Sequence, residues 1–279
     1  MNKILLAVLA HPDDESFGMG GTLAYYAAKG VDVHLLCATK GEVGEVPPDL
    51  LKNFNSIADL RESELHCAAS ILRIKEVHFL GYRDSGMAGS PDNHDPRALA
   101  SQPVDEVAGV IVDHIRELKP QVIVTFDPIG GYRHPDHIAV HQATVRAFEL
   151  SGNERFLRGN SVPFLPDRLY FHTFSRGFIR TAVKLLKLFR QDPAKFGKNK
   201  DIDLESFANE NFLIDAVIKI KRVRDLKDKA GQCHTSQGGG RIGGGILSHF
   251  MKLFGNNESF MQAYPKKPYS RIKSHDLFV

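Results

Sequence analysis

Short apolar runs alternate with helix-like segments through the first 150 residues, and this alternation constrains the fold more than any other feature of the chain. The run Ile4–Leu9 is apolar throughout, as expected for a parallel strand covered on both faces. A β–α–β–α rhythm predicts an open parallel sheet with helices on both faces. The expected strands are Ile4–Leu9, Val31–Cys37, Val77–Leu80, Gln121–Phe126 and Asp167–His172. The expected helices are Phe17–Lys29, Ile57–Leu72, Val104–Leu118 and Pro135–Leu150.

This rhythm favours an α/β fold with a Rossmann-like sheet of strand order 3-2-1-4-5. In such sheets the ligand lies outside the carboxyl ends of the strands, where the strand order reverses. The first and fourth strands are neighbours at that reversal. The polar run His11–Glu15 follows the first strand, and the run Gly130–His137 follows the fourth. The topology therefore predicts that two runs more than 100 residues apart in sequence meet in space.

The length of 279 residues suits one large domain, or one domain with an appended lobe. We expect an α/β core over residues 1–172. A less regular C-terminal lobe over residues 173–279 would complete the substrate pocket as part of the same domain. Within this lobe, Ile214–Lys229 is a helix candidate, and six glycines in residues 238–245 predict a flexible loop.

The segment 176–200 is unusually basic, with eight Lys or Arg against one Asp. Its first part, Arg176–Arg190, is predicted to be a helix with basic residues on one face and apolar residues on or near the other. A solvated lid helix is the interpretation we favour. Contact with a membrane surface through residues 176–190 is the alternative.

Composition excludes several classes of protein. The net charge of +3 is mild, and no nucleic-acid motif is present. Cys37, Cys67 and Cys233 are odd in number and far apart, so we expect no disulfide framework, which fits a reducing compartment. The first apolar run is far shorter than the roughly 20 residues that span a bilayer, and no cleavage signal follows it. These features predict a cytoplasmic protein without a cleaved leader.

The two polar runs hold the ligand types of a hydrolytic metal site. Such a site needs about three protein ligands and an open position for water. His11 and Asp14 can supply two ligands from one turn, and His137 can supply the third. Asp13 would then lie next to the metal as the general base. Zinc is the expected metal, and Fe²⁺ is possible because the ligand set suits both.

His134 lies one helical turn before His137 and should face the same pocket. As an imidazolium it could polarise a carbonyl oxygen or protonate a leaving amine, with Asp136 orienting it. His141, four residues after His137, is a weaker ligand candidate. A structural role is expected for the glycines in Gly18–Gly21, which begin too late for a dinucleotide fingerprint. The remaining histidines in strand or helix patterns are expected to be structural or exposed: His34, His66, His78 and His114.

The runs Ala10–Glu15 and His134–His137 resemble those of the PIG-L/LmbE family of zinc-dependent N-deacetylases. Further likeness at Thr39–Glu45, Arg61–Glu64 and Arg83–Gly89 points to the branch of the mycothiol-biosynthesis deacetylase and the mycothiol S-conjugate amidase. The run His-Thr-Ser-Gln that begins at His234 is a further, weaker similarity to the family.

The resemblance implies roles that agree with the residue chemistry. It implies zinc ligation by His11, Asp14 and His137, a general base at Asp13, and an electrophile or acid at His134. It also implies that Tyr132 assists at the oxyanion. The implied contacts to sugar hydroxyls come from Arg61 and Asp84, joined by Glu45. For His234 two placements stay open: it reaches the pocket, or it is exposed.

The predicted function is a zinc-dependent amidohydrolase that removes acetyl from an N-acetylglucosamine conjugate. One alternative keeps the chemistry and cleaves the amide of a thiol S-conjugate. Another is an inactive glycan binder at a membrane surface. The partner is therefore a small amino-sugar conjugate, and the chain is a candidate homo-oligomer. The basic segment 176–200 and the loop 238–245 have no counterpart that identifies the group attached to the sugar.

Overall fold

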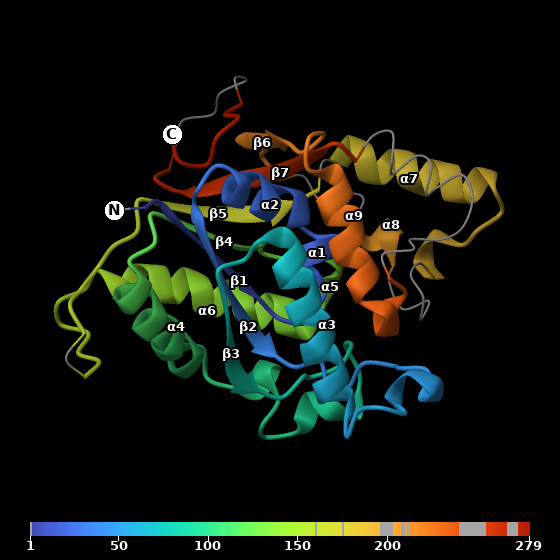
Figure 1. Ribbon diagram of the computed structural model, residues 1–279, viewed down its shortest axis with the longest axis horizontal. Coiled ribbons are helices and arrows are strands. Elements are labelled where there is room, and N and C mark those ends of the chain that lie inside the picture. Colours follow the sequence, from blue (N-terminus) through green and yellow to red (C-terminus); the bar gives the residue numbers. More distant parts are fainter. Residues whose placement is uncertain are drawn as a thin grey trace.

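The computed structural model describes residues 2–159, 161–174, 176–195, 203–207, 210, 212–239, 255–266 and 273–279. The described strands form one seven-stranded sheet in the order β3-β2-β1-β4-β5-β7-β6 (Figure 1). The strands are β1 Ile4–Leu9, β2 Asp32–Thr39, β3 Glu76–Tyr82, β4 Val122–Phe126, β5 Arg168–Thr173, β6 Ala216–Lys219 and β7 Asn257–Tyr264. The helices are α1 Asp14–Phe17, α2 Gly20–Ala28, α3 Ile57–Leu72, α4 Val104–Leu118, α5 Gly130–Arg133, α6 Pro135–Ser151, α7 Arg176–Leu188, α8 Leu204–Phe207 and α9 Arg224–Cys233.

The predicted strand order 3-2-1-4-5 is confirmed for the first five strands, which are all parallel. Their apolar residues fill the core: every residue of β4 is buried, and so are five of the six in β1. The sheet is mixed, however, because β7 pairs antiparallel with β5 and β6 pairs antiparallel with β7. The C-terminal region therefore extends the same sheet.

One predicted helix is wrong in its first half. Within Ile214–Lys229, residues 216–219 form β6, and α9 begins only at Arg224. Val217 and Ile218 are β-branched, and their backbone pairs with Ser259 and Glu258 of β7. Pairing with a distant strand overrides the local helical pattern. The predicted loop over 238–245 lies outside the described residues beyond Gly239.

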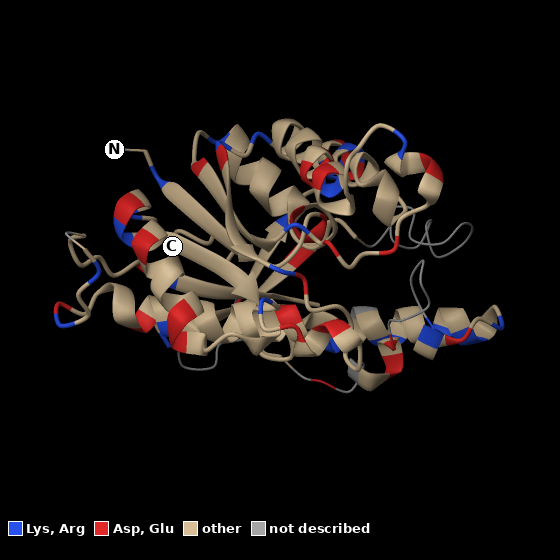
Figure 2. Ribbon diagram, turned by 90° about the horizontal axis from the view of Figure 1, so that it is seen from below, with Lys and Arg blue, Asp and Glu red and all other residues tan. Residues whose placement is uncertain are grey.

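Helices cover both faces of the sheet (Figures 1 and 2). Helices α4 and α6 pack against each other on one face, and α3 packs with α9 on the other, next to α2. The chain runs from β1 through β2 to β3 in one direction along the sheet and from β4 to β5 in the other. Because such crossovers are right-handed, the two sets of helices lie on opposite faces. The predicted helices Ile57–Leu72 and Val104–Leu118 are confirmed to the residue as α3 and α4.

The cysteines correct one prediction. Cys67 of α3 and Cys233 of α9 form a disulfide, with Cα atoms 5.9 Å apart across 166 residues of sequence. Packing of α3 against α9 brings them together, and neither spacing nor number could indicate this. Cys37 is free and buried. The expected lack of disulfides therefore no longer argues for a reducing compartment, and the cytoplasmic location stays a prediction.

Helix α7 is amphipathic, as expected. Ala182 and Leu186 are buried, whereas Arg180, Lys184 and Lys187 are exposed, and charged residues mark this helix in Figure 2. The protein covers this part of the apolar face, whereas Leu188 at the end of α7 and Phe189 just after it are exposed. Among the described helices, none combines the length and apolar character needed to cross a bilayer.

Gly21 marks a close approach between α2 and the C-terminal part of the sheet. A Cβ at this position would lie 2.5–2.7 Å from side-chain atoms of Ile220, which follows β6. The adjacent amides of Gly21 and Thr22 donate to the carboxylate of Glu258 in β7, at 3.1 and 2.6 Å. Close packing, expected for these glycines, is therefore the role of Gly21.

We predict that Gly21→Ala destabilises the protein by about 1–3 kcal/mol, because the added methyl overpacks a buried contact. Urea unfolding followed by circular dichroism measures the change. Gly177→Ala is the matched control, since a Cβ on this exposed helical glycine meets no atom within 4 Å. Equal stability of the Gly21→Ala variant and the parent would show that the C-terminal strands are not tightly docked on α2.

Candidate metal centre and active site

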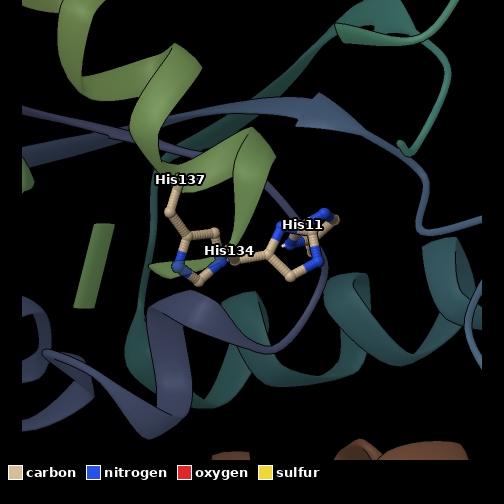
Figure 3. A group of neighbouring side chains, drawn as sticks. All are labelled: His11, His134 and His137. Carbon is tan, nitrogen blue, oxygen red and sulfur yellow. Dashed lines mark hydrogen bonds between the residues drawn. The ribbon is translucent and has the colours of Figure 1, made fainter. Parts of the chain in front are cut away.

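The two polar runs meet at the carboxyl ends of β1 and β4, as the strand order requires. Strand β1 pairs directly with β4, Leu5 opposite Val122. His11 lies just beyond β1, whereas His134 and His137 lie at the start of α6. The three imidazoles converge from these two elements (Figure 3). All three are at least 94 % buried.

The three predicted ligands face one another at the spacing of a metal site. His11 Nδ1 lies 3.5 Å from Asp14 Oδ2, and Asp14 Oδ1 lies 3.2 Å from His137 Nε2. His137 Nε2 lies 3.3 Å from His11 Nδ1. Tetrahedral zinc with bonds of about 2.0–2.1 Å requires ligand atoms about 3.3–3.4 Å apart. The separation of the two imidazole nitrogens fits that requirement, and each of them has one oxygen of Asp14 at about the same spacing.

Hydrogen bonds at the far side of each imidazole favour the matching tautomer. His11 Nε2 lies 3.1 Å from Asp136 Oδ2, and His137 Nδ1 lies 3.2 Å from the carbonyl oxygen of Gly130. A proton on each of these nitrogens leaves a lone pair on the nitrogen that faces Asp14. Burial would raise the pKa of the Asp14 carboxyl, but His137 and His11 hold it well below its usual range.

The Asp136 carboxylate was expected to orient His134, but in the structure it forms hydrogen bonds with other groups. It accepts from His11, from the Ser85 amide at 2.9 Å and from the Ser85 hydroxyl. The amide of Asp136, not its carboxylate, meets His134 and donates to Nδ1 at 3.2 Å. Asp136 therefore orients His11, and His134 serves as the N-cap of α6.

His134 lies in an environment that disfavours its charge. Burial, together with His11 and His137, holds the pKa of its imidazole well below the usual range. Because Nδ1 accepts a hydrogen bond, the proton of the neutral ring belongs on Nε2. The ring of Tyr132 lies 5.9 Å from that of His134 and 5.0 Å from that of His137. These side chains provide neutral donors beside the three candidate ligands.

Asp13 has a backbone conformation that side chains rarely adopt, with φ +124°. Its amide donates to Glu15 Oε2 at 2.9 Å, and its carboxylate accepts from Arg61 Nη2 at 3.1 Å. Burial raises the pKa of Asp13 to about 6, against the opposing charge of Arg61. A carboxyl poised near neutrality suits proton transfer in both directions.

Glu15 and His234 form a fully buried pair behind Asp13. His234 Nε2 lies 2.7 Å from Glu15 Oε1, and both side chains are 0 % exposed. Burial would lower the pKa of His234, but Glu15 raises it. The exposed placement considered for His234 is therefore wrong. Glu15 connects His234 to the amide of Asp13.

Of the residues expected at the sugar, two lie beside the candidate site: Arg61 donates to Asp13, and Asp84 lies next to His11. Arg61 is buried and donates to the carbonyl oxygens of Pro12 and Gly41 at 2.6 and 3.1 Å. Asp84 Oδ1 lies 3.6 Å from His11 Nε2 and accepts from the Gly86 amide at 2.8 Å. Glu45 is exposed in the loop after β2.

Three supporting residues were not identified from the sequence. Ser85 joins Asp136 to the loop after β3. Glu64 accepts from the Thr235 hydroxyl and the Ser236 amide, both at 2.7 Å, and so ties α3 to the residues after His234. Glu42 accepts from the Asp84 amide at 3.1 Å. The one available signal was the spacing of Glu64, which follows Arg61 by three residues and so shares its helix face.

Two similar curated proteins are named for the same activity. The chain is 37% identical over 246 residues to the 1D-myo-inositol 2-acetamido-2-deoxy-α-D-glucopyranoside deacetylase of Acidothermus cellulolyticus, covering 85% of this chain and 80% of the relative. It is 39% identical over 211 residues to the enzyme of the same name from Streptomyces avermitilis, covering 72% and 71%.

Similar folds are found among solved structures. The conserved protein TT1542 of Thermus thermophilus superposes with a TM-score of 0.61 at 26% identity, over 96% of this chain and 99% of that one. The N,N′-diacetylchitobiose deacetylase of Pyrococcus horikoshii gives 0.66 at 20% identity, over 96% and 88%. The 4-carboxy-2-hydroxymuconate hydratase GalB of Pseudomonas putida gives 0.59 at 21% identity, over 97% and 100%.

The model of the PIG-L family, described as GlcNAc-PI de-N-acetylase, matches residues 6–148. This span covers more than half of the chain. It includes both polar runs, most of β1 and all of β2 to β4. The chain belongs to the GlcNAc-PI de-N-acetylase family.

Proposed function

We propose that this protein is a zinc-dependent N-deacetylase that hydrolyses the acetamide of an N-acetylglucosamine–inositol conjugate. The observation that carries the proposal is the spacing of 3.2–3.5 Å among His11 Nδ1, the Asp14 carboxylate and His137 Nε2, with Asp13 beside them. The names of the relatives at 37% and 39% identity give the substrate class. Zinc held by these three residues would supply Lewis acidity to water and to the amide carbonyl.

The chain's own residues provide proton transfer and charge stabilisation. Asp13, with a pKa raised to about 6, accepts a proton from the attacking water. The Nε2–H of neutral His134 and the hydroxyl of Tyr132 donate to the amide oxygen as negative charge develops there. Asp13 then returns that proton to the departing amine, which leaves as the carbon–nitrogen bond breaks. Arg61 holds the Asp13 carboxylate in place through its hydrogen bond of 3.1 Å.

The sugar binds beside Arg61, Asp84 and Glu45, whose charged groups accept or donate hydrogen bonds to hydroxyls. The C-terminal region completes the pocket on the opposite side. A small hollow there is lined by Gly131, next to Tyr132, by Thr173 at the end of β5 and by Ile179 of α7.

Amide cleavage in a thiol S-conjugate is the second candidate, since the same residues could act on any linear amide. The two activities differ in their products. Deacetylation releases acetate and leaves a free amine on the sugar, whereas cleavage of the conjugate releases a mercapturate.

We predict that the zinc-loaded protein releases acetate from 1D-myo-inositol 2-acetamido-2-deoxy-α-D-glucopyranoside faster than from N-acetylglucosamine. A chelator should abolish turnover, and zinc should restore it. Coupled acetate assays and mass spectrometry of the amine follow the reaction, with Fe²⁺ reloading as a parallel arm. Mercapturate release from an S-conjugate at a higher kcat/KM would select the second candidate. Full activity in the metal-free protein would contradict both.

We predict that Asp13→Asn lowers kcat by about 10²–10⁴-fold, because the amide cannot accept the proton from water. Zinc content, measured by elemental analysis, should equal that of the parent, since Asp13 is not a ligand. Asp49→Asn is the control, because Asp49 is an exposed carboxylate outside the pocket. Near-normal turnover of the Asp13→Asn variant with zinc bound would disprove the assignment of the base.

His234 is proposed to position Asp13 through Glu15 rather than to touch the sugar, because its side chain is 0 % exposed. We predict that His234→Gln lowers kcat by about 10–100-fold while KM stays close to that of the parent. Steady-state kinetics separates the two constants, and exposed His66→Gln serves as the control. A rise in KM with kcat unchanged would instead assign His234 to direct substrate binding.

A further inference from the structure

We propose that the chain holds a second transition-metal site, built from His34 of β2 and from Glu76 and His78 of β3, with His114 of α4 beside it. The site is separate from the catalytic centre. His34 and Glu76 face each other across the register of β2 and β3 near the amino ends of these strands. The catalytic residues lie beyond the carboxyl ends of β1 and β4.

The three side chains converge on one point. His34 Nδ1 lies 3.8 Å from Glu76 Oε2, and His78 Nε2 lies 3.4 Å from the same oxygen. One ligand atom from each of the three residues lies within 4.8 Å of the others. The separation of Glu76 from His78 is close to the roughly 3.3–3.4 Å that tetrahedral zinc requires, and that from His34 is a few tenths of an ångström longer. A small adjustment of the exposed Glu76 together with the two imidazoles would complete the geometry.

The imidazole nitrogens at this point lack the hydrogen bonds that a structural role would give them. Among the described residues, no hydrogen-bond partner is found for His34 Nδ1, His78 Nε2 or His114 Nδ1, although all three atoms are buried. The His34 side chain is only 5% exposed. A buried nitrogen without a partner costs free energy, and a metal ion would remove that cost.

A third imidazole lies next to the cluster. The rings of His78 and His114 lie 5.1 Å apart, which places a third imidazole next to the cluster as a fourth ligand or as a partner for a bound water. Two or three imidazoles with one carboxylate are a ligand set for zinc.

Bound metal would tie the edge of the sheet together. Strand β3 is the edge strand, and most of its residues are only partly buried. Its residues Glu76 and His78 would be joined to β2 through His34 and to α4 through His114. Glu76 is 56% exposed, so the site is open to an ion from solvent. The site therefore has an entry path and would stabilise the native state when loaded.

Zinc stoichiometry of the full-length protein tests the proposal. After dialysis against zinc and removal of loosely bound ion, the parent should hold two zinc ions per chain by elemental analysis. His34→Gln/His78→Gln should hold one, with acetate release unchanged. His11→Ala/His137→Ala should also hold one, and Co²⁺ loading of this variant should show a visible absorption spectrum from the second site alone. The matched control is His66→Gln, which removes an imidazole paired with a glutamate on the surface and should keep both ions.

The proposal would be overturned if the parent binds only one zinc ion. It would also be overturned if the His34→Gln/His78→Gln variant binds as many ions as the parent. If that variant does not fold, the His11→Ala/His137→Ala variant decides: zinc should raise its melting temperature, and no binding would reject the site. Failure here leaves the proposed deacetylase untouched, because acetate release depends on the first site.

Discussion

The pairing of β1 with β4 is the contact on which the rest of the structure depends. It places His11 and His137 side by side although 126 residues separate them in sequence. Each strand ends at the same edge of the sheet, so each delivers its polar run to the same point. Helix α6 begins there because His134 caps it and Pro135 suits its first position. The buried charged groups at this point are paired with one another, as Glu15 is with His234 and Asp13 with Arg61, which is how the core tolerates them.

The periodicity of the core made most of its elements predictable from sequence. Helix Ile57–Leu72 was predicted to the residue from its apolar positions, and in the structure the Ser56 side chain caps it by accepting from the Asp59 amide. Strands β6 and β7 were not predictable, since their conformation depends on pairing with each other and with β5. The Cys67–Cys233 pair likewise depends on the packing of α3 against α9. Local sequence carries no information about such contacts.

The candidate site was predictable in its residue types but only partly in its connections. A ligand that follows a strand directly, such as His11, can be located from topology alone. The partner of a side chain depends on where its rotamer points, and this is set by packing. The carboxylate of Asp136 therefore meets His11 instead of His134, and His234 lies buried behind Glu15. Both departures concern residues that support the reacting groups.

The same fold carries more than one chemistry, because a deacetylase and a hydratase both superpose on this chain at TM-scores of 0.66 and 0.59. The function therefore has to be argued from side chains. At the proposed first site, the Asp136 carboxylate and the Gly130 carbonyl oxygen each contact the outer nitrogen of a candidate ligand, His11 and His137 respectively. At the His34–His78 cluster, the described structure gives the inward nitrogens no such partner. The protein itself therefore holds the side chains of the proposed first site, whereas a metal at the proposed second site would supply the missing order, as a stabilising site at a sheet edge requires.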